Sequence, residues 1–325
     1  MTRLVYILAA SHSGSTLLSM LLGAHPQIAT IGEMSLSPKA MGDLDRYRCS
    51  CGDLIRRCRF WEQVREGMAS RGFAFDLANV GTDYRSVKSR YAQRLLGPLH
   101  RGRFLESLRD TALSMCPTWR TQLSEIHRRN AALASTILEL RRAQVIVDSS
   151  KTGVRLKYLL RNPGLDVKVI HLIRDGRAVA LTYMDPAGFA DARDPARRGG
   201  GMGSDRRSER FSIARAAYEW RRCVEEAENV LRSLPASQWT AIHYEEYCLE
   251  PQATLRRLQE FLGVEPGSQP REFRAVEQHV VGNGMRLDSA AGIQLDERWR
   301  EKLTEQELRT FNGVAGEMNR RYGCG

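Results

Sequence analysis

The chain has 325 residues, of which 42% are hydrophobic and 27% charged, a balance typical of a soluble globular protein and not of a disordered or collagen-like one. Its 49 Lys and Arg residues outnumber its 38 Asp and Glu residues, and the net charge of +11 favours anionic partners such as nucleotides, acidic glycans or membrane surfaces. No zinc-finger spacing, RNP motif or basic heptad segment accompanies this charge, so we expect no nucleic-acid partner.

Three features of the sequence bear on where the chain resides. No apolar run approaches the roughly 20 residues that a membrane span requires, so we expect no transmembrane segment. The apolar start at Leu4–Ala10 is short for a signal peptide, and cleavage after it would destroy the phosphate-binding motif described below. Seven cysteines, an odd number scattered along the chain, indicate mostly free thiols in a reducing compartment, and we predict a cytoplasmic protein.

One group of cysteines, Cys49, Cys51 and Cys58, is close together in the sequence. A structural zinc site usually has four ligands that include a C-x-x-C-like pair, which these three residues do not supply. We therefore predict a local loop staple or plain packing at this cluster, and no metal in the protein.

The predicted elements alternate between strands and helices along the chain. Leu4–Leu8 is a short apolar run that predicts a buried parallel strand, and a helix with leucines on one face follows at Thr16–Ala24. Ile28–Ile31 predicts a second, short strand. Residues from about 34 to 142 carry helical patterns between polar loops, and we interpret them as a helical insertion with helices at Arg101–Met115 and Trp119–Arg142.

The second half of the chain repeats this alternation. Apolar runs predict strands at Val145–Asp148, Val167–Ile173 and Thr240–His243. Helices are predicted through Tyr158–Leu160, near Arg177–Thr182, and at Ile213–Leu231, Gln252–Leu262 and Glu305–Tyr322. A loop from about 185 to 210 is rich in Pro, Gly and Arg, and we interpret its arginines as solvent-exposed. The pattern predicts an α/β fold: a single domain over 1–325 with a P-loop-like, three-layer arrangement, in which helices flank a central parallel sheet.

A turn of small residues joins the first strand to the first helix at Ser11–Ser15. Backbone N–H groups and the helix dipole point at an anion in such a turn, which predicts a phosphate site. Compared with the ATPase loop GxxxxGK[ST], the second glycine is present as Gly14 and the final hydroxyl as Thr16. However, Ala9 replaces the first glycine and Ser15 replaces the lysine. The loop therefore suits a 5′-phosphate better than Mg·ATP.

A second anion site is predicted where the strand Val167–Ile173 ends. Arg174 follows this strand directly, at the edge of the sheet where ligands of open α/β folds bind. An arginine that closes a buried strand rarely lacks an anionic partner. Thr182 lies about two turns along the following helix, so both side chains can face one phosphate.

Three segments, taken in order, resemble sulfotransferases that use 3′-phosphoadenosine 5′-phosphosulfate (PAPS). The first runs from Ser13 through His25-Pro26 to Glu33 and is similar to their 5′-phosphosulfate loop and catalytic glutamate. The second, LIRDGRA at 172–178, resembles their 3′-phosphate motif. The third resembles a further shared block and contains Tyr244-Glu245, Pro251 and Phe261–Gly263. The resemblance is strongest to protein-tyrosine sulfotransferases and their bacterial small-molecule relatives, and it leaves out residues 34–142.

The resemblance implies a role for each matching residue. The 5′-phosphosulfate would be held by His12, Ser13, Gly14, Ser15 and Thr16. The 3′-phosphate would be held by Arg174 and Thr182, and Tyr244 would lie near the nucleotide. Lys151 would contact the bridging oxygen, and Glu33 would be the general base. A loop closing over the nucleotide, matched only with a gap, would contain Gly282, Asn283, Arg286 and Arg298.

Two positions depart from the family pattern. His12 stands where Lys or Arg is typical, which makes charge neutralisation at the phosphosulfate weaker or pH-dependent. Pro186 stands where the tyrosine-specific members have a further arginine, so specificity for peptide tyrosine is not implied. Glu33, Lys151 and Arg286 also have a plain alternative, as ordinary surface side chains.

The sequence thus predicts an enzyme that moves a sulfuryl group from PAPS to an acceptor hydroxyl by in-line displacement, with Glu33 as base, no metal, and adenosine 3′,5′-bisphosphate as product. Two alternatives stay open: a P-loop kinase, disfavoured by the absence of Gly-Lys-Ser/Thr, and a non-catalytic nucleotide-binding module. The alternative bases are His100, His127 and His243. The expected acceptor is a small molecule, glycan or lipid, in a pocket shaped by residues 34–142 and 185–210.

Overall fold

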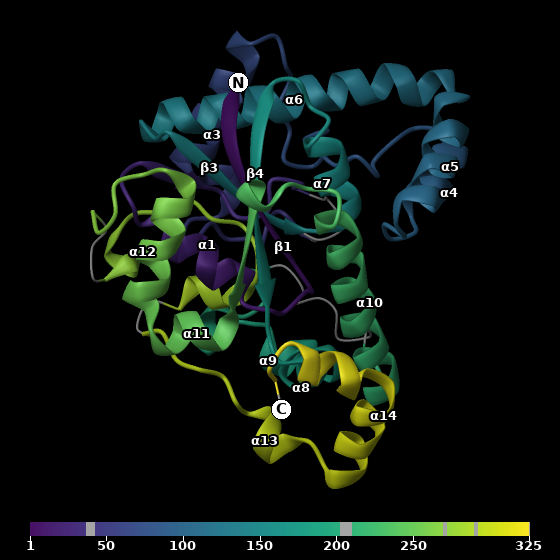
Figure 1. Cartoon of the computed structure of the whole chain (residues 1–325). Helices are drawn as coiled ribbons and strands as arrows, with labels where there is room; N and C mark the ends of the chain where they lie inside the picture. Colours follow the sequence, from purple (N-terminus) through teal and green to yellow (C-terminus); the bar gives the residue numbers. More distant parts are fainter. Residues whose placement is uncertain (37–42, 202–209, 269–271, 289–291, 325) are drawn as a thin grey trace.

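Five parallel strands form a sheet at the centre of the molecule (Figure 1). The structure is a computed structural model that describes residues 1–36, 43–201, 210–268, 272–288 and 292–324. The strand order is β2-β3-β1-β4-β5. The strands are β1 (Thr2–Ala9), β2 (Ile28–Thr30), β3 (Val145–Lys151), β4 (Leu165–Ile173) and β5 (Trp239–His243). The predicted α/β fold with a central parallel sheet is confirmed.

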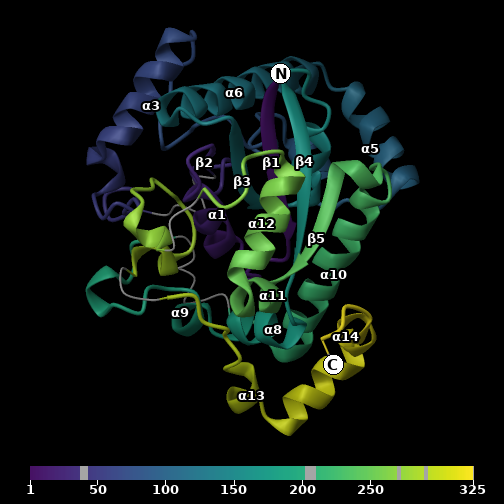
Figure 2. The same cartoon turned by 60° about the vertical axis from the view of Figure 1, so that its left-hand side comes forward.

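The central strand β1 is buried on both sides because alternate residues face opposite layers of helices. Leu4 and Tyr6 belong to one core, shared with α3 (Arg59–Ser70), α6 (Pro117–Arg141) and α7 (Gly153–Leu159). Val5 and Ile7 belong to the other core, shared with α1 (Ser15–Gly23), α11 (Tyr244–Leu249) and α12 (Pro251–Leu262). Figure 2 shows α12 lying across this second face. The continuous apolar run in the sequence therefore reflects a strand covered twice.

A third cluster of helices extends the molecule beyond the end of β4. Trp220 and Phe311 are buried where three helices meet, namely α8 (Gly176–Met184), α10 (Ile213–Leu231) and α14 (Glu305–Arg321). Thr304 and Glu307 form a capping box that fixes the start of α14. The other α-helices of the described residues are α4 (Arg90–Leu96), α5 (Arg103–Ser114), α9 (Pro186–Phe189) and α13 (Trp299–Lys302).

The observed elements differ from the predicted ones mainly at their ends. β3 continues three residues past Asp148, because its polar end still pairs with β1, with an irregularity before Lys151. Helices α3 and α11 were not predicted. The interval from 185 to 210 contains α9 and a 3₁₀ turn at Pro195–Arg197, and its residues 202–209 lie outside those that the structure describes.

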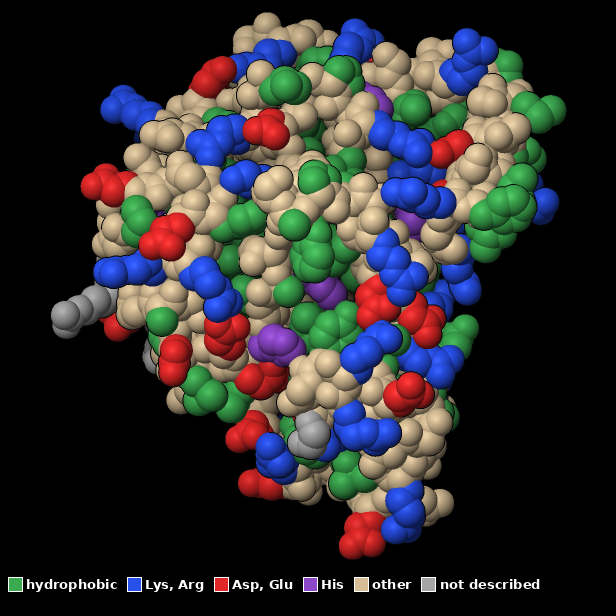
Figure 3. Space-filling model, in the orientation of Figure 1, with side chains coloured by type: hydrophobic (Ala, Val, Ile, Leu, Met, Phe, Trp, Pro, Cys, Tyr) green, Lys and Arg blue, Asp and Glu red, His purple; other side chains and the backbone are tan. Residues whose placement is uncertain are grey.

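On the face drawn in Figure 3, Lys and Arg side chains lie among Asp and Glu side chains. Several arginines form ion pairs with a glutamate three residues away on the same helix or turn. Among the described residues, no helix has both the length and the apolar character that crossing a membrane requires.

Candidate functional site

A cavity of about 580 Å³ lies where the strands of the sheet end and α1 begins. The loop after β1, the ends of β3 and β4, and segments from 187 to 198 and 274 to 298 contribute to its wall. It brings together most of the predicted site residues, which are His12, Gly14, Ser15, Thr16, Glu33, Lys151, Arg174, Thr182, Tyr244, Asn283 and Arg298. Positions spread over almost 290 residues of chain therefore converge on one space.

The start of α1 presents backbone donors to this cavity. The first hydrogen bond within the helix runs from the N–H of Leu18 to the carbonyl of Gly14, at 3.0 Å. The N–H groups of Ser15, Thr16 and Leu17 therefore have no acceptor in the helix, and no side chain caps them. Free N–H groups of this kind, together with the helix dipole, are suited to bind an anion, and the predicted phosphate site stays a prediction.

Two tyrosines from α11 pack closely against Gly14 of this loop. The hydroxyl of Tyr247 donates to the carbonyl of Gly14 at 2.9 Å. Gly14 has φ +87°, and a Cβ atom there would lie 2.3 Å from Tyr247 Oη and 2.5 Å from the ring of Tyr244. A glycine is therefore required both by the backbone conformation and by the close approach of the rings.

Arg174 leaves the end of β4 and closes one side of the cavity. Its guanidinium donates to the carbonyl of His12 at 2.8 Å and lies 4.2 Å from the ring centroid of Tyr244. The Nε atom of Arg174 is buried and has no hydrogen-bond partner among the described residues. Thr182, on α8, also lines the cavity, and its hydroxyl donates to the carbonyl of Ala178.

A carboxylate that the sequence did not reveal, Asp296, occupies the space between two arginines. It accepts hydrogen bonds from Arg174 at 3.0 Å and from Arg298 at 2.7 and 2.9 Å. Burial raises the pKa of Asp296, but the hydrogen bonds and charges of Arg298 and Arg174 outweigh it and hold the pKa well below its usual range. The protein thus places its own anion beside Arg174.

Glu33 and Lys151 form an ion pair at the opposite side of the loop. Each side chain is only 15% exposed. Glu33 follows Gly32, which has φ +80° and packs so closely on the chain that a Cβ would lie 1.9 Å from the carbonyl oxygen of Val281. Lys151 itself has φ +73°, which is unusual for a residue with a side chain. Such strained positions persist where the surroundings fix them, often at functional sites.

Three predicted residues do not line the cavity. Arg286 is buried, and its five N–H groups donate to carbonyls of Arg48, Gly200, Val280, Gly282 and Asn283. Gly282 packs against Thr16, where a Cβ would lie 3.1 Å from its hydroxyl oxygen. The Ser13 hydroxyl is buried without a hydrogen-bond partner among the described residues. Arg286 and Gly282 thus shape the segment that brings Asn283 to the cavity.

Other lining residues were missed from the sequence. Arg193, Arg198 and Arg274 contribute charge to the wall, and the first two belong to the loop whose arginines were interpreted as merely solvent-exposed. Their spacing gives no local signal of a site. No described residue of the interval 43–142 lines the cavity, nor do the alternative bases His100, His127 and His243.

Comparison with known proteins gives one family match: the model described as "Sulfotransferase family" fits residues 5–267. No curated protein matches the sequence. Among solved structures, the sulfotransferase domain from the curacin biosynthetic pathway is 16% identical, with 97% of this chain and 98% of that chain covered and a TM-score of 0.44. The corresponding domain from the Synechococcus PCC 7002 olefin synthase is 16% identical, with 96% and 94% covered and a TM-score of 0.44. A sulfotransferase from Mycobacterium avium is 15% identical, with 96% and 75% covered and a TM-score of 0.44.

The packing of the loop predicts that Gly14→Ala is strongly destabilising. A matched control is Gly72→Ala, because Gly72 also has positive φ (+79°) but has nothing within 4 Å of a Cβ. The control should lose about 1 kcal/mol through backbone strain alone, and Gly14→Ala should lose a further 1–3 kcal/mol, roughly, from overpacking. Urea unfolding of the two variants measures the difference, and equal losses would contradict the clash with the tyrosines.

Proposed function

The chain belongs to the sulfotransferase family, and from this premise we propose that it transfers the sulfuryl group of PAPS to a hydroxyl group of a small acceptor. The observation that carries the proposal is the meeting of three groups in one cavity. These are the uncapped start of α1, the strand-end arginine Arg174, and the ion pair of Glu33 with Lys151. The first two offer anion sites, and the third offers a base beside a cation.

The nucleotide would span the two anion sites. Its 5′-phosphosulfate would accept hydrogen bonds from the N–H groups at the start of α1 and from the hydroxyl of Thr16. The Ser13 hydroxyl has no hydrogen-bond partner among the described residues, but it does not line the cavity, so the backbone donors of α1 and Thr16 carry this assignment. The 3′-phosphate would bind Arg174, whose Nε is also without a partner in the part of the chain that the structure describes, with Thr182 and Arg298 beside it.

The proposed chemistry is one displacement at sulfur. Glu33 removes the proton of the acceptor hydroxyl, and the resulting oxygen forms a bond to sulfur. The bond between sulfur and the bridging phosphate oxygen breaks, and its electron pair stays on adenosine 3′,5′-bisphosphate, next to Lys151. The products are a sulfate ester, the bisphosphate and a proton on Glu33. In this scheme, as in phosphoryl transfer, the rate enhancement comes mostly from positioning of the reactants and from electrostatic stabilisation of the transition state.

The ion pair gives Lys151 two successive partners in this proposal. Without nucleotide its ammonium group is held by Glu33. The bridging oxygen of a bound nucleotide would compete for that ammonium, and Glu33 would then be free to accept a proton. The base would therefore be released only when the group to be transferred is present.

The wall of the cavity suits a small acceptor with both polar and apolar parts. Leu17, Phe189 and Met285 are apolar, and they lie together with Arg193 and Arg198 on the lining. We propose a hydroxyl-bearing small molecule, sugar or lipid as the acceptor.

Arg174→Ala should weaken the binding of adenosine 3′,5′-bisphosphate. A hydrogen bond to a charged group contributes roughly 1.5–3 kcal/mol, so the dissociation constant should rise about tenfold to a hundredfold. Isothermal titration calorimetry measures this, with Arg309→Ala as a control because Arg309 is an exposed helix arginine paired with Glu305. An unchanged affinity would remove Arg174 from the nucleotide site.

Asp296→Asn should have the opposite effect and tighten nucleotide binding about tenfold, since a neutral amide competes less well than a carboxylate for Arg174. Because the pKa of Asp296 is held well below its usual range, the carboxylate is ionised across neutral pH, and the gain should be equal at pH 6 and pH 8. Asp45→Asn, at an exposed ion pair with Arg56, is the control. Weaker binding in Asp296→Asn would show that Asp296 supports the site instead of competing for it.

Glu33→Gln should lower kcat by about 10²–10⁴, the usual share of a general base, without weakening nucleotide binding, because a neutral amide competes less well than a carboxylate for Lys151. The change is nearly isosteric, and Glu33 lies on the other side of the loop from Arg174. Labelled PAPS with a panel of phenols, sugars and lipids gives the turnover, and calorimetry gives the affinity. If kcat stays near that of the wild type, the base is elsewhere, and His12, a histidine that lines the cavity, would be tested next.

A further inference from the structure

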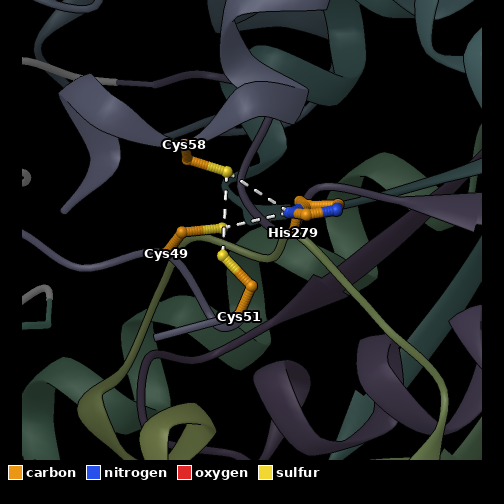
Figure 4. A group of neighbouring side chains, drawn as sticks. All are labelled: Cys49, Cys51, Cys58 and His279. Carbon is orange, nitrogen blue, oxygen red and sulfur yellow. Dashed lines mark hydrogen bonds between the residues drawn. The ribbon is translucent and has the colours of Figure 1, made fainter. Parts of the chain in front are cut away.

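Three cysteines and a histidine meet outside the cavity (Figure 4). Cys49 and Cys51 lie in one tight turn, Cys58 lies directly before α3, and His279 comes from a segment more than 220 residues further along the chain. The sulfur atoms and a ring nitrogen all lie within 4.8 Å of one another. The fourth ligand that the sequence did not reveal is thus supplied by the fold.

Three of the six distances between these four atoms match those of a tetrahedral zinc site, and all six lie within 4.8 Å. Cys51 Sγ lies 3.7 Å from Cys58 Sγ, and His279 Nδ1 lies 3.4 Å from Cys58 Sγ and 3.5 Å from Cys49 Sγ. Zinc bonds of about 2.3 Å to sulfur and 2.0–2.1 Å to nitrogen, arranged tetrahedrally, place sulfurs about 3.8 Å apart and sulfur about 3.6 Å from nitrogen. A disulfide would need about 2.05 Å, and all three cysteines are free thiols. The predicted loop staple is therefore not a disulfide in this structure.

The backbone around Cys49 and Cys51 forms a turn that brings their sulfur atoms together. The pairing of Arg48 with Leu54 and the hydrogen bond from Cys49 N–H to the Asp53 carbonyl (2.9 Å) fold the turn so that both of its sulfurs face one point. Gly52 has φ +100° in this turn. Figure 4 shows the three sulfur atoms converging on one edge of the His279 ring.

The second ring nitrogen of His279 lies near a carboxylate. His279 Nε2 lies 3.4 Å from a carboxylate oxygen of Glu277. The ring stacks on Phe60, with centroids 4.3 Å apart and planes 4° from parallel. A metal-binding histidine commonly directs its other ring nitrogen to a carboxylate, which fixes the tautomer and the orientation of the ring. These contacts orient Nδ1 toward the three sulfurs.

We propose that Cys49, Cys51, Cys58 and His279 bind one Zn²⁺ ion as a structural site. Three thiolates and one imidazole are a donor set that zinc takes in closed, four-coordinate sites. The four protein ligands leave no position open for a substrate or an activated water. The site is therefore a cross-link in the fold and has no part in the transfer reaction.

The cross-link would hold a segment that reaches the cavity. Val281, two residues after His279, donates to the carbonyl of Ile31 at 2.8 Å, directly before Gly32 and Glu33. Asn283, two residues further on, lines the cavity. A zinc ion at His279 would thus anchor this strand-like segment to the turn at Cys49 and keep Glu33 and Asn283 in place.

The test is the zinc content of the full chain, purified without a polyhistidine tag from zinc-supplemented cells and measured by inductively coupled plasma mass spectrometry. We expect one zinc ion per chain in the wild type. Cys51→Ser should lose it, with affinity reduced by more than about a hundredfold, beyond the 10–100-fold typical of outer-shell changes. Cys51 is the exposed member of the cluster, so its substitution disturbs core packing least. Cys116→Ser, a cysteine outside the cluster, should keep the full zinc content.

A second measurement on the unmodified chain keeps the proposal testable if Cys51→Ser does not fold. Iodoacetamide should fail to label Cys51 in the native protein although it is exposed, and should label it after zinc is removed with a strong chelator. The melting temperature should fall on zinc removal and recover when zinc is restored. A zinc-free wild type that binds none on titration, or full zinc content in Cys51→Ser, would overturn the proposal.

Discussion

The side of the cavity that carries Glu33 and Lys151 depends on one buried carboxylate, that of Asp148. It is fully buried near the end of β3, where an unpaired charge would cost several kcal/mol. Arg155 supplies the countercharge and donates a hydrogen bond of 2.9 Å to one carboxylate oxygen. The other carboxylate oxygen accepts hydrogen bonds from two backbone N–H groups, one directly after Glu33 and one directly before Lys151. A single group thus fixes the backbone beside both members of the ion pair. The strained φ of Lys151 is understandable in this setting, because the buried carboxylate holds its neighbour.

The side of the cavity at the start of α1 is built differently, because two tyrosine side chains fill the space behind the loop. Gly14 permits a left-handed turn, and the hydroxyl of Tyr247 holds its carbonyl from behind. The ring of Tyr244 then serves two purposes, since it packs against the glycine and supports the guanidinium of Arg174. Arg174 in turn holds the carbonyl of His12. The loop is therefore formed before any ligand arrives, which reduces the ordering cost of binding.

Local signals in the sequence were enough for the sheet and for part of the site, and they failed where the chain folds back on itself. Arg174 could be placed at the cavity because a residue that follows a buried parallel strand must emerge at the edge where ligands bind. His279 could not be joined to Cys58, since 221 residues separate them and no spacing rule connects them. Arg286 looked like a ligand-binding arginine, but only the fold shows that its N–H groups are taken by carbonyls. Asp296 gave no signal because its role depends on two arginines brought to it by packing.

Arg174 and Lys151, two of the cations that we propose for the nucleotide site, are already paired with carboxylates, and this arrangement has a consequence for selectivity. An unpaired guanidinium or ammonium group in so enclosed a space would carry a large desolvation cost, which Asp296 and Glu33 remove. A ligand anion therefore gains only the difference between its own interaction with Arg174 or Lys151 and that of the carboxylate it displaces. A ligand with an anionic group at only one of the two positions would displace only one carboxylate. The other ion pair would stay intact and contribute nothing to binding. A nucleotide with phosphates at both the 3′ and 5′ positions would displace both carboxylates and interact with both cations. It should therefore bind more tightly than ATP, whose charge lies at one end only.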